Sequence, residues 1–297
     1  MTGDNFSQTR ALEPQASRVC IIGAGELGGA IAHALARGER VARVLLIDSA
    51  GSVGAGKALD IQQSGAVEGF HTQLAGTDDL TRATACSVCV VADRAGQPSE
   101  EWQGDEGLAM LSRLAGYIGR APIVFAGANQ SSLLTTAARE LGIRRDRLIG
   151  SAPDAFASAV TAIVAMEARC SPTEVRVAVL GTPPSSFIIP WSEASIGGYA
   201  LERVLTQVQL ARLDARVSRL WPPGPYALGQ AAAGVVEGIV TSSRRAFNVL
   251  SMLHGEFGVR DRPGAFPALL APSGIVHVRV PTLNTRERVQ LETALGA

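Results

Sequence analysis

Residues 18–48, RVCIIGAGELGGAIAHALARGERVARVLLID, decide the expected fold of this 297-residue chain. The apolar run at residues 19–22 predicts a buried strand, and the glycine-rich turn GAGELG follows it at once. A stretch with helical spacing comes next, and a second apolar run at residues 41–47 predicts another strand, which ends on Asp48. A strand, a glycine-rich turn, a helix and a second strand in this order are typical of the unit that opens a doubly wound parallel sheet.

The spacing of the glycines in the turn predicts a dinucleotide site. Gly23 permits a tight turn, Gly25 lets the backbone approach a pyrophosphate, and Gly28 lets the helix pack closely on the strand. The first N–H groups of the helix, around Glu26 and Leu27, would present the partial positive charge of the helix N-terminus to the phosphates. The alternative is a glycine-rich strand–helix turn that binds no ligand.

Asp48 indicates which nucleotide is preferred. It lies about 20 residues beyond the last glycine of the turn, where a carboxylate can accept hydrogen bonds from both ribose hydroxyls. Its charge would repel the 2′-phosphate of NADP, so the predicted cofactor is NAD. Glu26 is the conflicting residue, because its carboxylate would approach the pyrophosphate unless it turns towards solvent.

Composition and charge argue against several functional classes. With a formal net charge of zero and 18% charged residues, the chain lacks the charge pattern of a nucleic-acid or membrane surface. No apolar run reaches the roughly 18–20 residues of a membrane span, and residues 1–16 are polar, so we expect a flexible N-terminal arm on a cytoplasmic protein. Cys86 and Cys89 have a CxxC spacing, but without a second pair or a nearby histidine they predict buried thiols and no metal site.

The rhythm of the chain predicts two domains. From residue 17 to residue 150, apolar runs alternate with helical stretches, which indicates an α/β, NAD-binding Rossmann domain with a doubly wound parallel sheet. Ligands bind such sheets beyond the carboxyl ends of the strands, where we expect the turn, Ala95, Gly96 and Asn129 to gather. Residues 151–297 predict a second, mixed α+β domain. Its expected elements are helices at 201–220 and 226–242 and strands at 175–180, 251–257 and 274–280.

A series of stretches extends from the glycine turn almost to the end of the chain. They are GAGELG, LLID followed by GKALDIQQSG, AGTDD, RLIG at 147–150, VLG at 179–181, IPWS at 189–192, YALG at 226–229, SMLHGEFGVRD at 251–261 and SGIVHVRVPTLNTRERVQL at 273–291. In this order and spacing they resemble the lactate and malate dehydrogenases, and the later segments are closer to the lactate branch. The resemblance implies a Rossmann domain followed by a substrate domain, NAD as cofactor, a small-molecule ligand, and a homodimer or homotetramer.

The resemblance also implies where the catalytic residues should lie, and this chain lacks them. The family uses a histidine as proton donor, an aspartate that orients it, and arginines that grip the substrate carboxylate and polarise its carbonyl. By register with the family's motifs, Pro183 stands at the position of the histidine and Phe156 at that of the aspartate. Ala159 replaces the carboxylate-gripping arginine, and Asp105 replaces the polarising one. Of the family's chemical set, Asn129 remains.

Two functions remain open from the sequence. The first is a catalytically degenerate NAD(H)-binding protein that acts as a sensor, a scaffold or a partner subunit. The second is an active NAD-dependent oxidoreductase with another proton donor and a neutral or cationic alcohol as substrate, which the acidic stretch at residues 97–108 would suit. A positioned acid–base group contributes roughly 10²–10⁴ to a rate, so the loss of several groups that act together favours the first.

Overall fold

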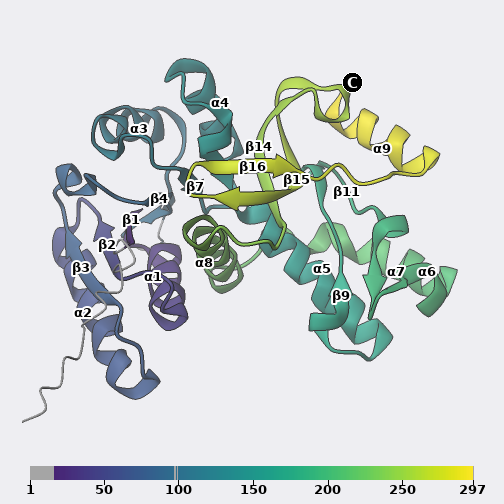
Figure 1. Ribbon diagram of the computed structural model, residues 1–297, viewed down its shortest axis with the longest axis horizontal. Helices are drawn as coiled ribbons and strands as arrows, with labels where there is room; N and C mark the ends of the chain where they lie inside the picture. Colours follow the sequence, from purple (N-terminus) through teal and green to yellow (C-terminus); the bar gives the residue numbers. More distant parts are fainter. Residues whose placement is uncertain (1–16, 97, 99, 297) are drawn as a thin grey trace, which may run out of the picture.

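The computed structural model describes residues 17–296 except 97 and 99, so the expected arm at residues 1–16 lies outside the described part. Its centre is an 11-stranded sheet (Figure 1). The parallel part of this sheet has the spatial order β3 (Gln73–Thr77), β2 (Arg43–Ile47), β1 (Arg18–Ile22), β4 (Val88–Val91), β7 (Ile123–Phe125) and β8 (Leu148–Gly150). The chain moves outward in one direction from β1 to β3 and in the other from β4 to β8, which confirms the predicted doubly wound fold.

The sheet continues into an antiparallel part that the second half of the chain forms. Its strands are, in spatial order, β14 (Phe247–His254), β15 (Arg260–Ala271), β10 (Leu180–Thr182) and β11 (Ser186–Ile188), with β16 (Gly274–Val278) paired to β15. Strand β14 joins the two parts, because Leu250 pairs with Gly150 of β8. The proposed domain boundary at residue 150 therefore falls at the end of a strand inside a shared sheet.

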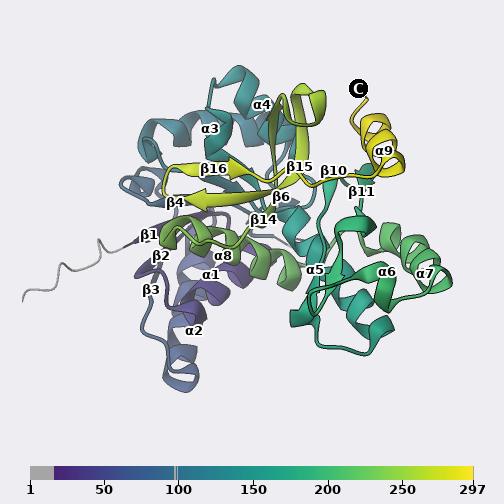
Figure 2. The ribbon, with the colours of Figure 1, turned by 45° about the vertical axis from the view of Figure 1, so that its right-hand side comes forward.

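Helices cover both faces of the parallel part. On one face lie α1 (Glu26–Gly38), α2 (Gly51–Glu68) and α8 (Pro225–Thr241), and on the other α3 (Gly104–Ile118) and α4 (Ser131–Glu140) (Figures 1 and 2). Along β1, Val19 and Ile21 belong to the first core, whereas Cys20 and Ile22 belong to the second. A strand buried on both faces requires an uninterrupted apolar run, which is what residues 19–22 supply.

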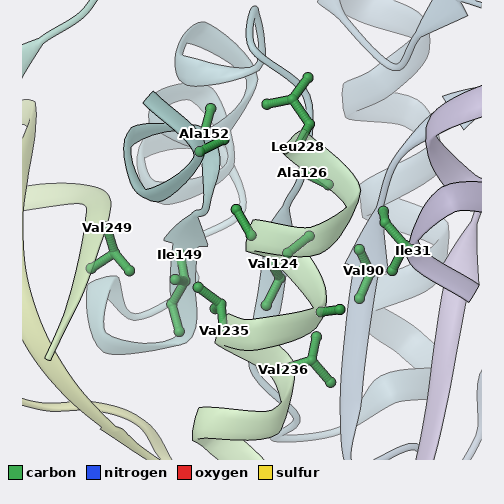
Figure 3. Close-up of a cluster of buried hydrophobic side chains, with 14 of the residues drawn as sticks. Ile31, Val90, Val124, Ala126, Ile149, Ala152, Leu228, Val235, Val236 and Val249 are labelled. Carbon is green, nitrogen blue, oxygen red and sulfur yellow. The ribbon is translucent and has the colours of Figure 1, made fainter. Parts of the chain in front are cut away.

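Helix α8 comes from the second half of the chain but packs on the first. Its Val235 lies beside Val124 of β7 and Ile149 of β8 (Figure 3). Gly229 brings α8 close to α1, because an added Cβ there would lie 2.8 Å from the Cβ of Ala30. The second half therefore completes the core beneath the strands that carry the glycine turn.

The remaining elements of the second half are mostly short. Helix α5 (Ala152–Ala168) follows β8, and a three-stranded sheet of β13 (Tyr199–Ala200), β12 (Ser195–Ile196) and β9 (Val175–Arg176) lies near α6 (Leu201–Val204) and α7 (Gln207–Val217). Helix α9 (Thr285–Leu295) packs on β10 and β11, as Figure 2 shows. In the first half, β5 (Asp93–Arg94) and β6 (Glu100–Glu101) form a separate antiparallel pair.

The single helix expected at residues 201–220 is wrong. Leu205 is extended and ends α6, and Thr206 then begins α7 with a capping box. The hydroxyl of Thr206 accepts from the N–H of Gln209, and the side chain of Gln209 accepts from the N–H of Thr206 at 3.0 Å. The capping box therefore begins a new helix, although the spacing of apolar residues is helical through the whole stretch.

The strands expected at residues 175–180 and 251–257 also have the wrong bounds. The first stretch is divided between β9 and β10, and the N–H of Val179 between them donates to the side chain of Asn248 at 3.0 Å. The second strand starts earlier, at Phe247, and stops at His254 because Gly255 has a φ of +116°.

Candidate functional site

The glycine turn lies at the carboxyl end of β1, where α1 begins. Gly23 has a φ of +111°, and its N–H donates to the carbonyl of Ile47 at 2.7 Å, which fixes the turn to the neighbouring strand. A Cβ added at Gly28 would overlap the carbonyl of Gly23, so only glycine permits this approach of the helix to the turn. The turn thus has the shape that its spacing predicts.

Asp48 is buried at the end of β2 and is bound by backbone N–H groups from three segments. Its Oδ2 accepts from Ala24 and from Ala95 at 2.8 Å each, and its Oδ1 accepts from Ala50 at 2.9 Å. Only 3% of Asp48 is exposed. The carboxylate therefore joins the glycine turn to the segments that follow β2 and β4, the two strands on either side of β1. These bonds occupy most of its acceptor capacity.

A second buried carboxylate, that of Asp93, lies directly on the start of α1. Its Oδ2 accepts from the N–H of Leu27 at 3.0 Å, and its Oδ1 accepts from the N–H of Gly28 at 2.8 Å. The carbonyl of the same residue accepts from the N–H of Gly25 at 3.0 Å. Asp93 therefore caps the helix N-terminus at Leu27, one of the donors expected for a pyrophosphate, and at the next N–H, that of Gly28.

Two charged side chains flank the turn. Glu26, the residue that conflicted with a pyrophosphate, is exposed. Lys57, the only lysine of the chain, reaches from α2 and donates to the carbonyl of Gly25 at 2.6 Å. An ammonium group therefore lies beside the turn, whereas the nearest acidic group of α1 lies at the protein surface.

A third carboxylate caps the turn after β7. The oxygens of Glu101 accept from the N–H groups of Ala128 and Asn129 at 2.9 Å each. The side chain also fills the space above Gly127, where an added Cβ would overlap it. Asn129, which was expected to contact a cofactor, is exposed, and its backbone N–H is the group that Glu101 binds. Gly96, which follows Ala95, is exposed as well.

Arg94 pairs with two further acidic side chains of this region. It donates to Glu100 at 2.7 Å and to Glu106 at 2.6 Å, and its guanidinium lies 5.2 Å from the ring centre of Trp102. Two of the carboxylates of the acidic stretch are therefore paired with a base, while Asp105 is exposed. Arg94 lies just outside the stretch, on β5, and Glu101 within the stretch binds the turn after β7.

The space between the ends of β7 and β8 and the chain near Pro183 is filled with apolar side chains. Phe156 of α5 is fully buried, and its ring meets those of Phe187 and Trp221 edge to face, with centres 5.0 and 5.5 Å apart. Beside Pro183 and Trp221 a cavity of about 20 Å³ remains, which is room for roughly one water molecule. Of the described residues that line it, Gln130 and Ser131 have polar side chains.

Gln130 cannot serve as an acid or a base in this cavity. Its Oε1 accepts from the N–H of Gly127 at 2.9 Å, and its Nε2 donates to the carbonyls of Ala92 and Trp102 at 3.0 and 3.2 Å. The amide thus holds the turn after β7 to the end of β4.

Malate and lactate dehydrogenases are similar to this chain over nearly its whole length. No protein-family model matches it. The malate dehydrogenase of Salinibacter ruber is 25% identical over 296 residues, which cover 94% of each sequence, and that of Cytophaga hutchinsonii is 28% identical over 299 residues, which cover 93% of this chain and 94% of the relative. The solved structure of the Salinibacter ruber enzyme matches with a TM-score of 0.82 at 23% identity over 94% of each chain.

A lactate dehydrogenase from Cryptosporidium parvum, solved with lactic acid and NAD, matches with a TM-score of 0.84 at 18% identity over 95% of each chain. This is the fold of the malate and lactate dehydrogenases. In this chain the glycine turn, Asp48 and Ala95 lie together at the carboxyl edge of the parallel strands.

The four positions at which the sequence resemblance predicts the family's catalytic groups do not line one pocket. Pro183 lines the small cavity, and Phe156 is packed in the core behind it. Ala159 is half-buried further along α5, and Asp105 is exposed in the first turn of α3. That these residues replace the family's catalytic groups stays a prediction. Sequence reasoning missed Asp93 and Glu101, whose signal is an acidic residue at either end of a short segment after β4.

The cysteines and histidines suggest no further chemistry. Cys20, Cys86 and Cys89 are buried thiols in the second core, and a hydrogen bond with Cys86 together with burial raises the pKa of Cys20. Within the described residues, no three His, Cys, Asp or Glu side chains are close enough together to hold a metal ion. No helix in the described part of the chain is long and apolar enough to cross a bilayer.

Proposed function

We propose that the chain is a catalytically degenerate member of the malate and lactate dehydrogenase family that binds NAD(H) and acts as a sensor, a scaffold or a partner subunit. The filled substrate pocket carries this proposal. Phe156, Phe187 and Trp221 occupy the space behind Pro183, and the remaining cavity of about 20 Å³ has room for roughly one water molecule, not a 2-oxo acid.

The chemistry of the replaced residues supports the same conclusion. Reduction of a ketone creates an alkoxide, which must be stabilised and protonated as it forms. Pro183 has no side-chain proton and no backbone N–H. Phe156 and Ala159 would leave a substrate carboxylate against apolar surface, where an unpaired charge costs several kcal/mol or more. Because these groups act as a unit, restoring one of them does not restore the reaction.

The coenzyme edge supports NAD(H) as the ligand, although its present arrangement does not accommodate a pyrophosphate. The turn has the required glycines, and Asp48 would disfavour the 2′-phosphate of NADP. The donors of Leu27 and Gly28, however, are occupied by Asp93, so binding requires that carboxylate to move away. The proposed contacts are Gly23, Gly25, Glu26, Leu27, Gly28, Asp48, Ala95, Gly96 and Asn129.

The same proposal includes the organisation of the molecule. Residues 17–150 would bind the nucleotide, residues 151–297 would form the substrate-type domain, and two or four copies would assemble. Light scattering on the purified protein measures the assembly directly, and the mass of a monomer at micromolar concentration would contradict it.

A titration with NADH, followed by calorimetry and set beside NADPH, tests the proposed function. We expect saturable NADH binding, weaker NADPH binding, and no oxidation or reduction of 2-hydroxy or 2-oxo acids at the nicotinamide absorbance. Failure to bind either nucleotide at millimolar concentration would overturn the proposal. A change in nicotinamide absorbance with neutral or cationic alcohols would instead favour an active oxidoreductase with a different substrate.

A further inference from the structure

The start of α1 already holds an anion, and that anion belongs to the protein. The two oxygens of Asp93 accept from consecutive N–H groups, those of Leu27 and Gly28, at 3.0 and 2.8 Å. Asp93 is 4% exposed, so this contact is shielded from solvent. A carboxylate in this place offers the same negative charge and paired acceptors as two oxygens of a phosphate.

Asp93 also occupies the space that the glycine motif leaves open. A Cβ added at Gly25 would overlap the carboxyl group of Asp93, although this open side of Gly25 is what allows a pyrophosphate to approach the backbone. The same carboxylate therefore takes the N–H of Leu27 and the space beside Gly25, both of which a dinucleotide's phosphates would need. The two anions cannot be bound at once.

A short backbone ladder keeps Asp93 in place. On β5 and β6, Asp93 pairs with Glu101 and Arg94 pairs with Glu100. Glu101, opposite Asp93, caps the N–H groups of the turn after β7 at the same edge of the sheet. This antiparallel pair thus places one carboxylate at the start of α1 and another at the turn after β7.

We propose that Asp93 is an internal competitor for the pyrophosphate of NAD(H), so that the protein holds its own coenzyme site closed until this carboxylate is displaced. The inference rests on the proposed NAD(H) binding. A capping contact of ordinary strength opposes ligand binding by roughly tenfold in affinity, which a dinucleotide can overcome. NAD(H) binding is then coupled to release of the helix cap, and the affinity of the natural chain is lower than that of the same scaffold without Asp93.

Dissociation constants for NADH, measured by calorimetry on Asp93→Ser, Asp93→Asn and the unaltered protein, test this proposal. Asp93→Ser removes the competing charge and most of its volume, so we expect binding at least about tenfold tighter, with Asp93→Asn in between. Asp60→Asn, at an exposed site on α2, is the matched control for the same change in net charge, and it should leave the affinity within about twofold.

The outcomes separate this inference from the proposed function. Equal affinities of the unaltered and Asp93→Ser proteins would overturn the competition but leave NAD(H) binding intact. Absence of NADH binding in every folded variant would overturn both. If Asp93→Ser does not fold, NMR of the unaltered protein decides: NADH should shift the carboxyl resonance of Asp93 and the amide resonances of Leu27 and Gly28, and unchanged resonances in the saturated complex would overturn the competition.

Discussion

The proposed coenzyme end, at the start of α1, and the proposed substrate end, beside Pro183, are closed by different chemistry. At the coenzyme end, Asp93 and Glu101 hold backbone N–H groups through hydrogen bonds at 2.8–3.0 Å. At the substrate end, Phe156, Phe187 and Trp221 are packed ring against ring. A hydrogen-bonded anion can be exchanged for another anion, whereas buried aromatic volume cannot be exchanged for a charged substrate. The first closure is reversible by a ligand, and the second is built into the core.

The largest expected effect is at the substrate end. Unaltered protein should turn over lactate, pyruvate, malate and oxaloacetate at least about 10⁴-fold more slowly than an intact dehydrogenase, since in the proposed function the proton donor, the orienting acid and the anion clamp are all replaced. Pro183→His should not rescue the reaction, because Phe156 and Ala159 remain. Steady-state assays on protein free of host dehydrogenase measure this. A turnover number in the ordinary range of such enzymes would contradict the claim that the substrate end is closed.

Truncation of the aromatic cluster should show how firmly the substrate end is filled. Phe156 is fully buried, so Phe156→Ala should lower the free energy of unfolding by about 3–5 kcal/mol. Met166→Ala on the same helix is the control, because Met166 is 70% exposed and its loss should change stability by less than about 0.5 kcal/mol. Urea unfolding compares the two. Equal, small effects would mean that the ring adds little to the core.

The next prediction concerns the preference of the coenzyme end for NADH over NADPH. Asp48→Asn keeps the shape of the side chain but removes the charge that opposes a 2′-phosphate. The ratio of the NADPH and NADH dissociation constants should fall roughly tenfold, which corresponds to about 1.4 kcal/mol. Calorimetry with both nucleotides measures this ratio. An unchanged ratio would show that Asp48 only joins the strand ends, as its bonds to Ala24, Ala50 and Ala95 already do.

A polar contact remote from the cleft provides the reference for a purely structural role. Arg145 donates to both oxygens of Glu256, at 3.0 and 2.9 Å. Burial raises the pKa of Glu256, but the hydrogen bonds from Arg145 and from the N–H of His254 outweigh it and leave the pKa below its usual value. The pair therefore stabilises the fold above the unfolded pKa, and this contribution is lost as pH falls through the folded pKa.

Replacement of this carboxylate should have the smallest effect. Glu256→Gln should cost about 1 kcal/mol of unfolding free energy near neutral pH, and the difference from the unaltered protein should shrink as the pH falls below about 4. NADH affinity should not change. If Asp93 variants behave in the same way, losing stability without gaining affinity, the coenzyme end is closed by structure alone.

The parts of the fold that the sequence predicted are those that local patterns determine. The run at residues 19–22, the spacing of Gly23, Gly25 and Gly28, and the position of Asp48 follow from burial, backbone conformation and strand length. Strand β15 was not anticipated, because Pro263 and Pro267 argue against a strand although both lie within its ladder with β14.

The closure of the site could not be predicted, because it depends on contacts between distant segments. Nothing local at Asp93 shows that its carboxylate meets Leu27 and Gly28, 66 and 65 residues earlier in the chain. In the same way, the resemblance predicts that Phe156 stands where the family has an aspartate, but it does not predict that Trp221 packs against this ring.

Calorimetric titration of oxamate, a 2-oxo acid analogue, into NADH-saturated Asp93→Ser protein tests the contrast between the two ends most directly. The variant should bind NADH, because its coenzyme end is open, and then give no heat with oxamate beyond dilution at millimolar concentration. Saturable oxamate binding to this complex would contradict the account, because it would show that the aromatic cluster yields to a charged substrate and that the substrate end is as reversible as the coenzyme end.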